Sequence, residues 1–147
     1  MKKLFTYASI LSVLLLSACH DDEKGTDPRT KNMNLLTSSV WVTESVDHTT
    51  DGDLTFQYEN FSIAFTQTGS SGMDGEYIAV NGGNAFPDSY GEWSLSSDSK
   101  TILLSNDQEM TIESLTEGSL VLNFIVEPPT GGRVEGVSGE FTFHLKH

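Results

Sequence analysis

Few side chains in this chain are spaced as a reaction would need. Its four histidines form no His-x-x-x-His pair and no Glu-flanked zinc motif, and no serine stands in a Gly-x-Ser-x-Gly elbow. Carboxylates are plentiful, but nothing in their spacing singles out a glycosidase-type pair. The sequence therefore predicts a protein that is not an enzyme, with no catalytic residue, no cofactor and no bound metal.

The densest cluster of oxygen donors is the segment Asp47–Asp53, which includes Gly52. A calcium loop of the EF-hand type alternates its acidic ligands and ends in a bidentate glutamate. Here the alternation fails at Thr49, so we interpret the segment as a hairpin loop. The glycine-rich runs Asn81–Asn84 and Thr130–Arg133 have no following helix, and we interpret them as turns rather than phosphate-binding loops.

Cys19 is the only cysteine, and it follows a segment with the features of a secretory signal. Two lysines precede an apolar stretch, Leu4–Leu16, and the small residues Ser17 and Ala18 come directly before the cysteine. The stretch is shorter than the roughly 20 residues that span a bilayer, and it fits a signal peptide. We expect residues 1–18 to be this signal peptide.

The run Leu16-Ser17-Ala18-Cys19 resembles the lipobox of bacterial lipoproteins at all four positions. In that family the cysteine sulfur receives a diacylglyceryl group, cleavage occurs just before it, and the new amine is usually acylated. The resemblance implies that Cys19 is the lipidation site and that acyl chains such as palmitate attach the protein to a membrane. Each buried methylene contributes ~0.8 kcal/mol, so two or three chains hold it firmly.

Residues 19–34 are interpreted as the lipidated N-terminus and a flexible acidic tether, because they are rich in charge and lack apolar periodicity. Within them, Asp21-Asp22-Glu23 resembles the acidic export signal of Bacteroidetes lipoproteins. That resemblance implies a lipid-anchored protein of the outer membrane, displayed on the cell surface. The alternative is attachment at the periplasmic face.

The composition excludes several classes of partner. Loss of Lys2 and Lys3 with the signal peptide takes the formal charge from −13 to −15. Such acidity argues against binding nucleic acid and against electrostatic docking on anionic membranes. With Cys19 acylated, no thiol remains for a disulfide, so the core alone must hold the fold.

Residues 35–147 form the predicted domain, and their pattern is β throughout. Short segments with alternating or β-branched residues recur about every ten residues, with turn residues between them. No segment has the pattern of a convincing amphipathic helix. The expected strands are Thr37–Val46, Leu54–Tyr58, Glu59–Thr68, Glu76–Val80, Glu92–Leu95, Thr101–Leu104, Glu109–Leu115, Ser119–Val126 and Glu140–Lys146.

About eight short strands in one all-β domain predict an antiparallel up-and-down meander that closes into a barrel, because closure removes exposed edges. An open β-sandwich is the alternative, since it uses the same alternation. The lipocalin-like lipoproteins of Bacteroidetes, which are typically eight-stranded barrels, are similar to this chain in four segments: Leu36–Ser45, Gly91–Leu95, Met110–Leu115 and Leu120–Leu122. Ser39 stands where the lipocalin Gly-x-Trp entry pattern has glycine.

Three aromatic residues, Trp41, Tyr77 and Trp93, are the candidates for lining a ligand pocket at the barrel mouth. They would stack on a sugar or on a flat apolar ligand. The alternative is plain core packing, and the supply of phenylalanine and leucine favours a filled interior.

The sequence thus predicts a non-enzymatic lipoprotein whose barrel binds either a small apolar or sugar ligand or an envelope partner protein. The alternative function is an accessory carbohydrate-binding or hydrolytic module of an outer-membrane uptake system.

Overall fold

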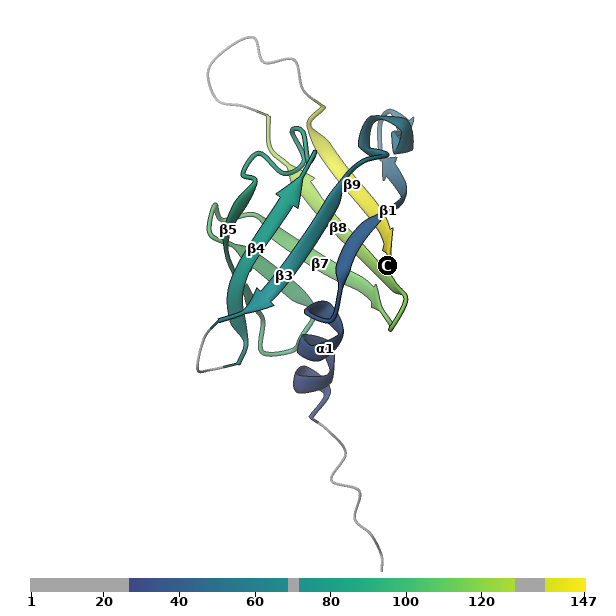
Figure 1. Cartoon of the computed structure of the whole chain (residues 1–147). Coiled ribbons are helices and arrows are strands. Elements are labelled where there is room, and N and C mark those ends of the chain that lie inside the picture. Colours follow the sequence, from purple (N-terminus) through teal and green to yellow (C-terminus); the bar gives the residue numbers. More distant parts are fainter. Residues whose placement is uncertain (1–26, 69–71, 129–136) are drawn as a thin grey trace, which may run out of the picture.

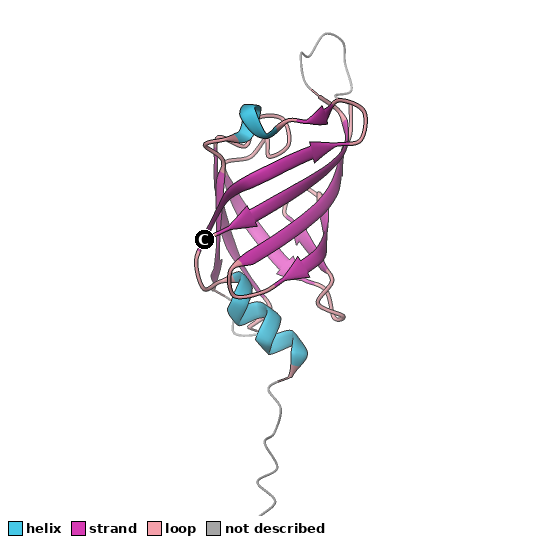
Figure 2. Ribbon diagram, turned by 90° about the vertical axis from the view of Figure 1, so that its right-hand side faces the viewer, coloured by secondary structure: helices cyan, strands magenta, loops and turns pink. Residues whose placement is uncertain are grey.

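The computed structural model of the chain describes residues 27–68, 72–128 and 137–147. These residues form an antiparallel β-barrel with a helix at one end, seen from two sides in Figures 1 and 2. The strands are β1 (Val40–His48), β2 (Gly52–Asp53), β3 (Ser62–Gln67), β4 (Asp74–Val80), β5 (Tyr90–Leu95), β6 (Thr101–Leu104), β7 (Glu109–Leu115), β8 (Ser119–Val126) and β9 (Gly139–Lys146).

The barrel is closed by pairing between its first and last long strands. From β3 to β9 each strand pairs with the next along the chain, β1 pairs with β3, and β1 also pairs with β9 from Val42 opposite Lys146 to His48 opposite Phe141. The short β2 pairs only with β1, as an extra strand outside the eight that close the barrel. The predicted up-and-down, lipocalin-like barrel is confirmed, and the open sandwich is wrong.

The predicted strand Leu54–Tyr58 is wrong, because residues 55–58 form a 3₁₀ turn, η1 (Thr55–Tyr58). Leu54, Phe56 and Tyr58 would share one face of a strand. In the turn, Leu54 and Tyr58 point into the core while Phe56 is 85% exposed. The Asp53 carboxylate accepts the Thr55 N–H at 2.8 Å, which starts the turn.

The flexible tether predicted to reach Asn34 is corrected over its last residues, which belong to α1 (Pro28–Leu36). Asp27 accepts the Thr30 N–H at the N-cap, and Pro28 occupies the first helical position, where no donor is needed. Met33 and Leu36 are fully buried against the barrel. The packed domain therefore begins at α1 and not at Leu35.

Close packing of aromatic rings fills the barrel interior. At the end opposite α1, five phenylalanines and one tyrosine meet with ring centroids 4.7 to 6.0 Å apart: Tyr58, Phe61, Phe86, Phe124, Phe141 and Phe143. Rings of this size exclude a ligand from the volume they occupy.

Candidate functional site

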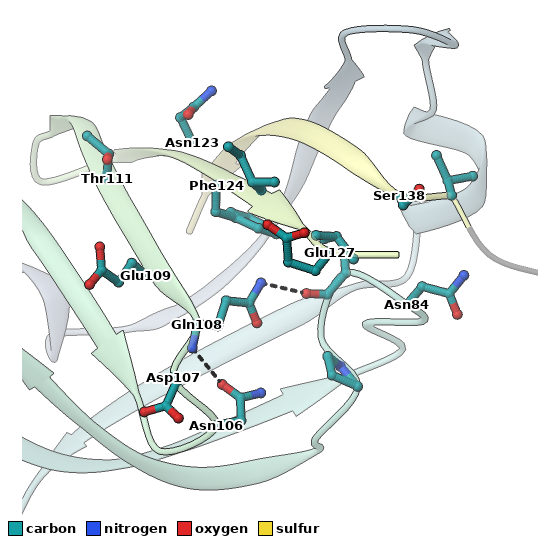
Figure 3. A pocket seen from close by; sticks show the side chains of 15 residues that line it. Asn84, Asn106, Asp107, Gln108, Glu109, Thr111, Asn123, Phe124, Glu127 and Ser138 are labelled. Carbon is teal, nitrogen blue, oxygen red and sulfur yellow. Dashed lines mark hydrogen bonds between the residues drawn. The ribbon is translucent and has the colours of Figure 1, made fainter. Parts of the chain in front are cut away.

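A groove of about 860 Å³ lies at the barrel end opposite α1, within the size range of small-ligand sites. It is bounded by the connection between β4 and β5, by the turn between β6 and β7, and by the ends of β7 and β8 (Figure 3). Antiparallel strands place every second connection at the same end of the barrel, which is why these distant segments meet. The groove therefore depends on the barrel's order of strands and not on one local motif.

The β6–β7 turn forms one wall, and its own hydrogen bonds hold it. The Asn106 carboxamide oxygen accepts the Gln108 N–H at 3.2 Å, and the Asp107 N–H donates to the Leu104 carbonyl at 3.0 Å. Asp107 adopts φ +65°, a left-handed conformation that aspartate tolerates better than most residues. The side chain of Asp107 is thereby exposed at the tip of the turn.

Two hydrogen bonds tie this turn to the β4–β5 connection. Gln108 donates from Nε2 to the carbonyl of the fully buried Ala85 at 3.0 Å, and Asn106 donates from Nδ2 to the Asp88 carboxylate at 3.0 Å. The connection itself folds over the barrel end, because Phe86 donates its N–H to the Gly82 carbonyl and stacks on Phe61. Both walls of the groove are thus fixed to the packed core.

The third side of the groove comes from neighbouring positions on β7 and β8. Thr111 and Asn123 are directly paired across these strands. Asn123 donates its two Nδ2 hydrogens to Glu140 at 3.0 Å and Thr142 at 3.1 Å, which orients its carboxamide. Apolar surface adjoins these polar groups and includes Phe124, Ile125, Val126 and Val137.

The groove is acidic. The carboxylates of Asp107, Glu109 and Glu127 lie around it (Figure 3), and none forms an ion pair or accepts a hydrogen bond from another described residue. All lysines and arginines in the described part of the chain lie at or near the other end: Arg29 and Lys31 on α1, Lys100 in the β5–β6 turn and Lys146 beside the β7–β8 turn. Among the described residues, the two ends of the barrel therefore differ in charge.

The three predicted pocket residues lie in the core and not in the groove. Trp41 is fully buried and donates from Nε1 to the Leu36 carbonyl at 2.9 Å, which ties α1 to β1. Trp93 is 2% exposed, and its Nε1 lies 3.1 Å from both the Thr66 and Glu76 carbonyls. Its cross-strand partner is Gly75, and the Thr66 carbonyl oxygen occupies the space where a Cβ on this glycine would lie.

Tyr77 is also buried, and its hydroxyl has no hydrogen-bond partner within the described residues. The ring covers its cross-strand partner Gly91, next to Ser105. Burial raises the pKa of the phenol, and the nearby negative charge of Asp88 raises it further. A second, shallower hollow of about 530 Å³ lies outside this position and shares Pro87 and Asn106 with the groove.

The segment Asp47–Asp53 is a hairpin, as predicted, with His48 paired to Gly52 across β1 and β2. His48 is buried and accepts the Asp51 N–H on Nδ1 at 3.1 Å, so its Nε2 donates to the Ser138 carbonyl at 3.2 Å. The described residues contain no group of three or more His, Cys, Asp or Glu side chains arranged to hold a metal ion.

An apolar row crosses the outer surface of four neighbouring strands. Val40, Ala64, Ile78 and Tyr90 are successive partners on β1, β3, β4 and β5, and all but Ala64 are more than half exposed. A parallel row pairs Val42, Ser62 and Val80. Contiguous exposed apolar surface of this kind is typical of protein contacts.

None of the groove residues was predicted as part of a ligand site. Asn84 belongs to a segment interpreted as a turn, whereas Glu109, Thr111 and residues 123–126 belong to predicted strands. The strand order was the available signal, because an up-and-down meander places the β4–β5 and β6–β7 connections at the same end of the barrel.

Cys19 and the residues before it lie outside the described part of the chain. Within residues 27–68, 72–128 and 137–147, no helix is long and apolar enough to cross a membrane. Comparison with known protein families and with curated proteins finds no match to this chain.

Proposed function

We propose that the protein is an outer-membrane lipoprotein, lipidated on Cys19 and displayed on the cell surface, whose barrel binds a small ligand without catalysing a reaction. The observation that carries the binding role is the groove at the barrel end, because the interior is filled and a volume of about 860 Å³ remains outside it. The groove thus takes the place of the expected aromatic-lined mouth.

The position of α1 supports this arrangement. Cys19 precedes Asp27 by eight residues, which span at most about 29 Å when extended. The helix lies at one end of the barrel (Figure 2). A lipid on Cys19 would hold that end near the membrane and leave the groove on the far side. A groove in that position is open to ligands that arrive from outside the membrane.

The anchor is tested by replacing the acylated sulfur. In a Cys19→Ser protein we expect the domain to leave the membrane fraction, while the wild-type protein stays with it. Protease treatment of intact cells then tests display, and degradation of the domain is expected. A Cys19→Ser protein that still partitions with membranes would contradict the anchor, and full protection from protease would contradict display.

The groove is tested by filling it. Thr111 is exposed on β7 and lines the groove, whereas Glu113 is exposed on the same strand outside it. Thr111→Trp should abolish saturation-transfer NMR signals from bound fragments of a small-molecule set added to the purified full-length protein. Glu113→Trp should keep them. Signals that survive Thr111→Trp, or their absence from the wild-type protein, would contradict binding in the groove.

The apolar row favours a second function, which is binding of an envelope protein. Two positions along β4 and β5 from Ile78 and Tyr90, the next outward-facing pair is Glu76 opposite Glu92. The expected partner surface is therefore apolar with basic residues at its edge. A photo-crosslinking residue at Ile78 should give one adduct of fixed mass in intact cells, and one at Glu113 should give none. Equal labelling at both positions, or none at Ile78, would contradict this function.

A further inference from the structure

We infer that the groove selects an organic cation with a short apolar part, such as an alkyl or aryl amine or a guanidinium compound. This inference rests on the proposed ligand-binding function and names the class of ligand. Three features of the groove carry it: its unpaired carboxylates, the carboxamide oxygens of Gln108 and Asn123, which are free among the described residues, and its apolar surface.

The carboxylates carry negative charge that no described residue neutralises. Asp107 and Glu109 lie on or beside the β6–β7 turn, and Glu127 comes from the opposite wall after β8 (Figure 3). A cation between these walls would meet charge from both, whereas an anion would be repelled from both. The described basic residues lie at or near the α1 end and do not offset this field.

The carboxamides of Gln108 and Asn123 add acceptors to the groove. Asn123 uses both of its Nδ2 hydrogens in bonds to β9 side chains, whereas Gln108 and Asn106 each use one of their two, in bonds to Ala85 and Asp88. The Gln108 and Asn123 carboxamide oxygens, by contrast, accept no hydrogen bond from another described residue. An ammonium or guanidinium group offers only donors, so it can bond to these two oxygens as well as to the carboxylates.

The spacing of the acidic groups favours an organic cation over a metal ion. The described residues hold no cluster of three carboxylate or imidazole groups close enough for one ion. The lining of the groove also includes the apolar residues Phe124, Ile125 and Val126. A ligand that combines a charged head with hydrocarbon would use both kinds of surface.

The test compares three probes with one carbon skeleton: cyclohexylmethylamine, cyclohexylmethanol and cyclohexanecarboxylate. Binding to the full-length protein is measured by saturation-transfer NMR at two salt concentrations. The amine, protonated at pH 7, should bind most tightly and weaken with added salt, and the carboxylate should not bind. Glu127→Gln and Glu109→Gln should each weaken amine binding about two- to fivefold, while Glu113→Gln, on β7 outside the groove, should leave it unchanged.

Each other outcome overturns the inference. If the alcohol or the carboxylate binds as tightly as the amine and Thr111→Trp removes its signal, the groove binds ligands but does not select cations. If the amine binds and neither glutamate variant weakens it, the carboxylates do not recognise it. If no probe binds, the groove does not select an organic cation. The small-molecule set compared between the wild-type protein and Thr111→Trp then shows separately whether the groove binds any ligand.

Discussion

Gln108 donates a hydrogen bond from Nε2 to the carbonyl oxygen of Ala85 at 3.0 Å. With the Asn106–Asp88 bond, this bond joins the β6–β7 turn to the β4–β5 connection, and its two residues are 23 positions apart in the chain. Ala85 is fully buried, so its carbonyl has no access to solvent as an alternative partner. The bond therefore fixes the separation of two groove walls.

Gln108→Leu should destabilise the protein by about 1–3 kcal/mol, because it leaves the buried Ala85 carbonyl without a donor. The free energy of unfolding is measured by urea denaturation. Gln57→Leu, at an exposed position on η1, is the control and should stay within about 0.5 kcal/mol of wild type. Equal stability of the two variants would show that the bond does not hold the walls.

Met33→Ala should destabilise the protein by about 2–5 kcal/mol, because the side chain is 1% exposed and its removal leaves a cavity under α1. Asn34→Ala, the exposed neighbour on the same helix, should change the free energy of unfolding by less than about 0.5 kcal/mol. If Met33→Ala unfolds at the wild-type urea concentration, α1 belongs to the tether and not to the domain.

Gly75→Ala should destabilise the protein by about 1–3 kcal/mol, since an added Cβ would lie 1.7 Å from the Thr66 carbonyl oxygen. The strands β3 and β4 would have to separate there. Gly118→Ala is the control, because no atom lies within 4 Å of its added Cβ. Thermal unfolding of both variants checks the prediction, and a Gly75→Ala midpoint equal to that of the control would refute it.

Tyr77→Phe should leave the protein as stable as wild type or more stable at pH 8, because the buried hydroxyl has no described partner. Burial raises the pKa of Tyr77 above its usual value near 10. The unfolded chain therefore releases this proton first, and wild-type stability falls as the pH rises above 10.

The same variant should accordingly lose less stability than wild type between pH 8 and pH 11, measured by urea unfolding at each pH. Tyr90→Phe, at a side chain that is 77% exposed, is the control and should stay within about 0.5 kcal/mol of wild type at pH 8. An identical alkaline slope in Tyr77→Phe and wild type would rule out a raised pKa at this site.

The barrel was predictable because inward and outward residues alternate along most strands. In β9, Phe141, Phe143 and Leu145 alternate with Thr142 and His144, and the structure buries only the first set completely. The 3₁₀ turn at Thr55–Tyr58 escaped prediction because its apolar residues have the spacing of a strand. There the hydrogen bond from the Thr55 N–H to the Asp53 carboxylate and the tertiary position of Tyr58 decide the conformation.

The helix α1 was missed for a different reason. Its apolar residues form no stripe, and only Met33 and Leu36 are buried. The Asp27-Pro28 pair is a helix-start signal that was available in the sequence. The residues before this pair are charged, and that composition led to the prediction of a tether instead of a helix.

The groove was not predictable from side-chain type, since aromatic residues drew attention to Trp41, Tyr77 and Trp93. In a barrel this narrow such large rings are needed inside, and each points away from solvent. The groove instead uses polar residues of turns, such as Asn84 and Asn106, which sequence reasoning assigns to loop structure alone. Their convergence becomes visible only once the strand order is known.

The most direct test of the central claim is an amide chemical-shift map of the ¹⁵N-labelled full chain titrated with cyclohexylmethylamine. Binding in the groove predicts saturable shifts at Asn84, Gln108 and Val126, with none at Met33 in α1. Shifts confined to the α1 end, or no saturable shift at these three groove residues, would contradict the claim that this end of the barrel binds a small cation.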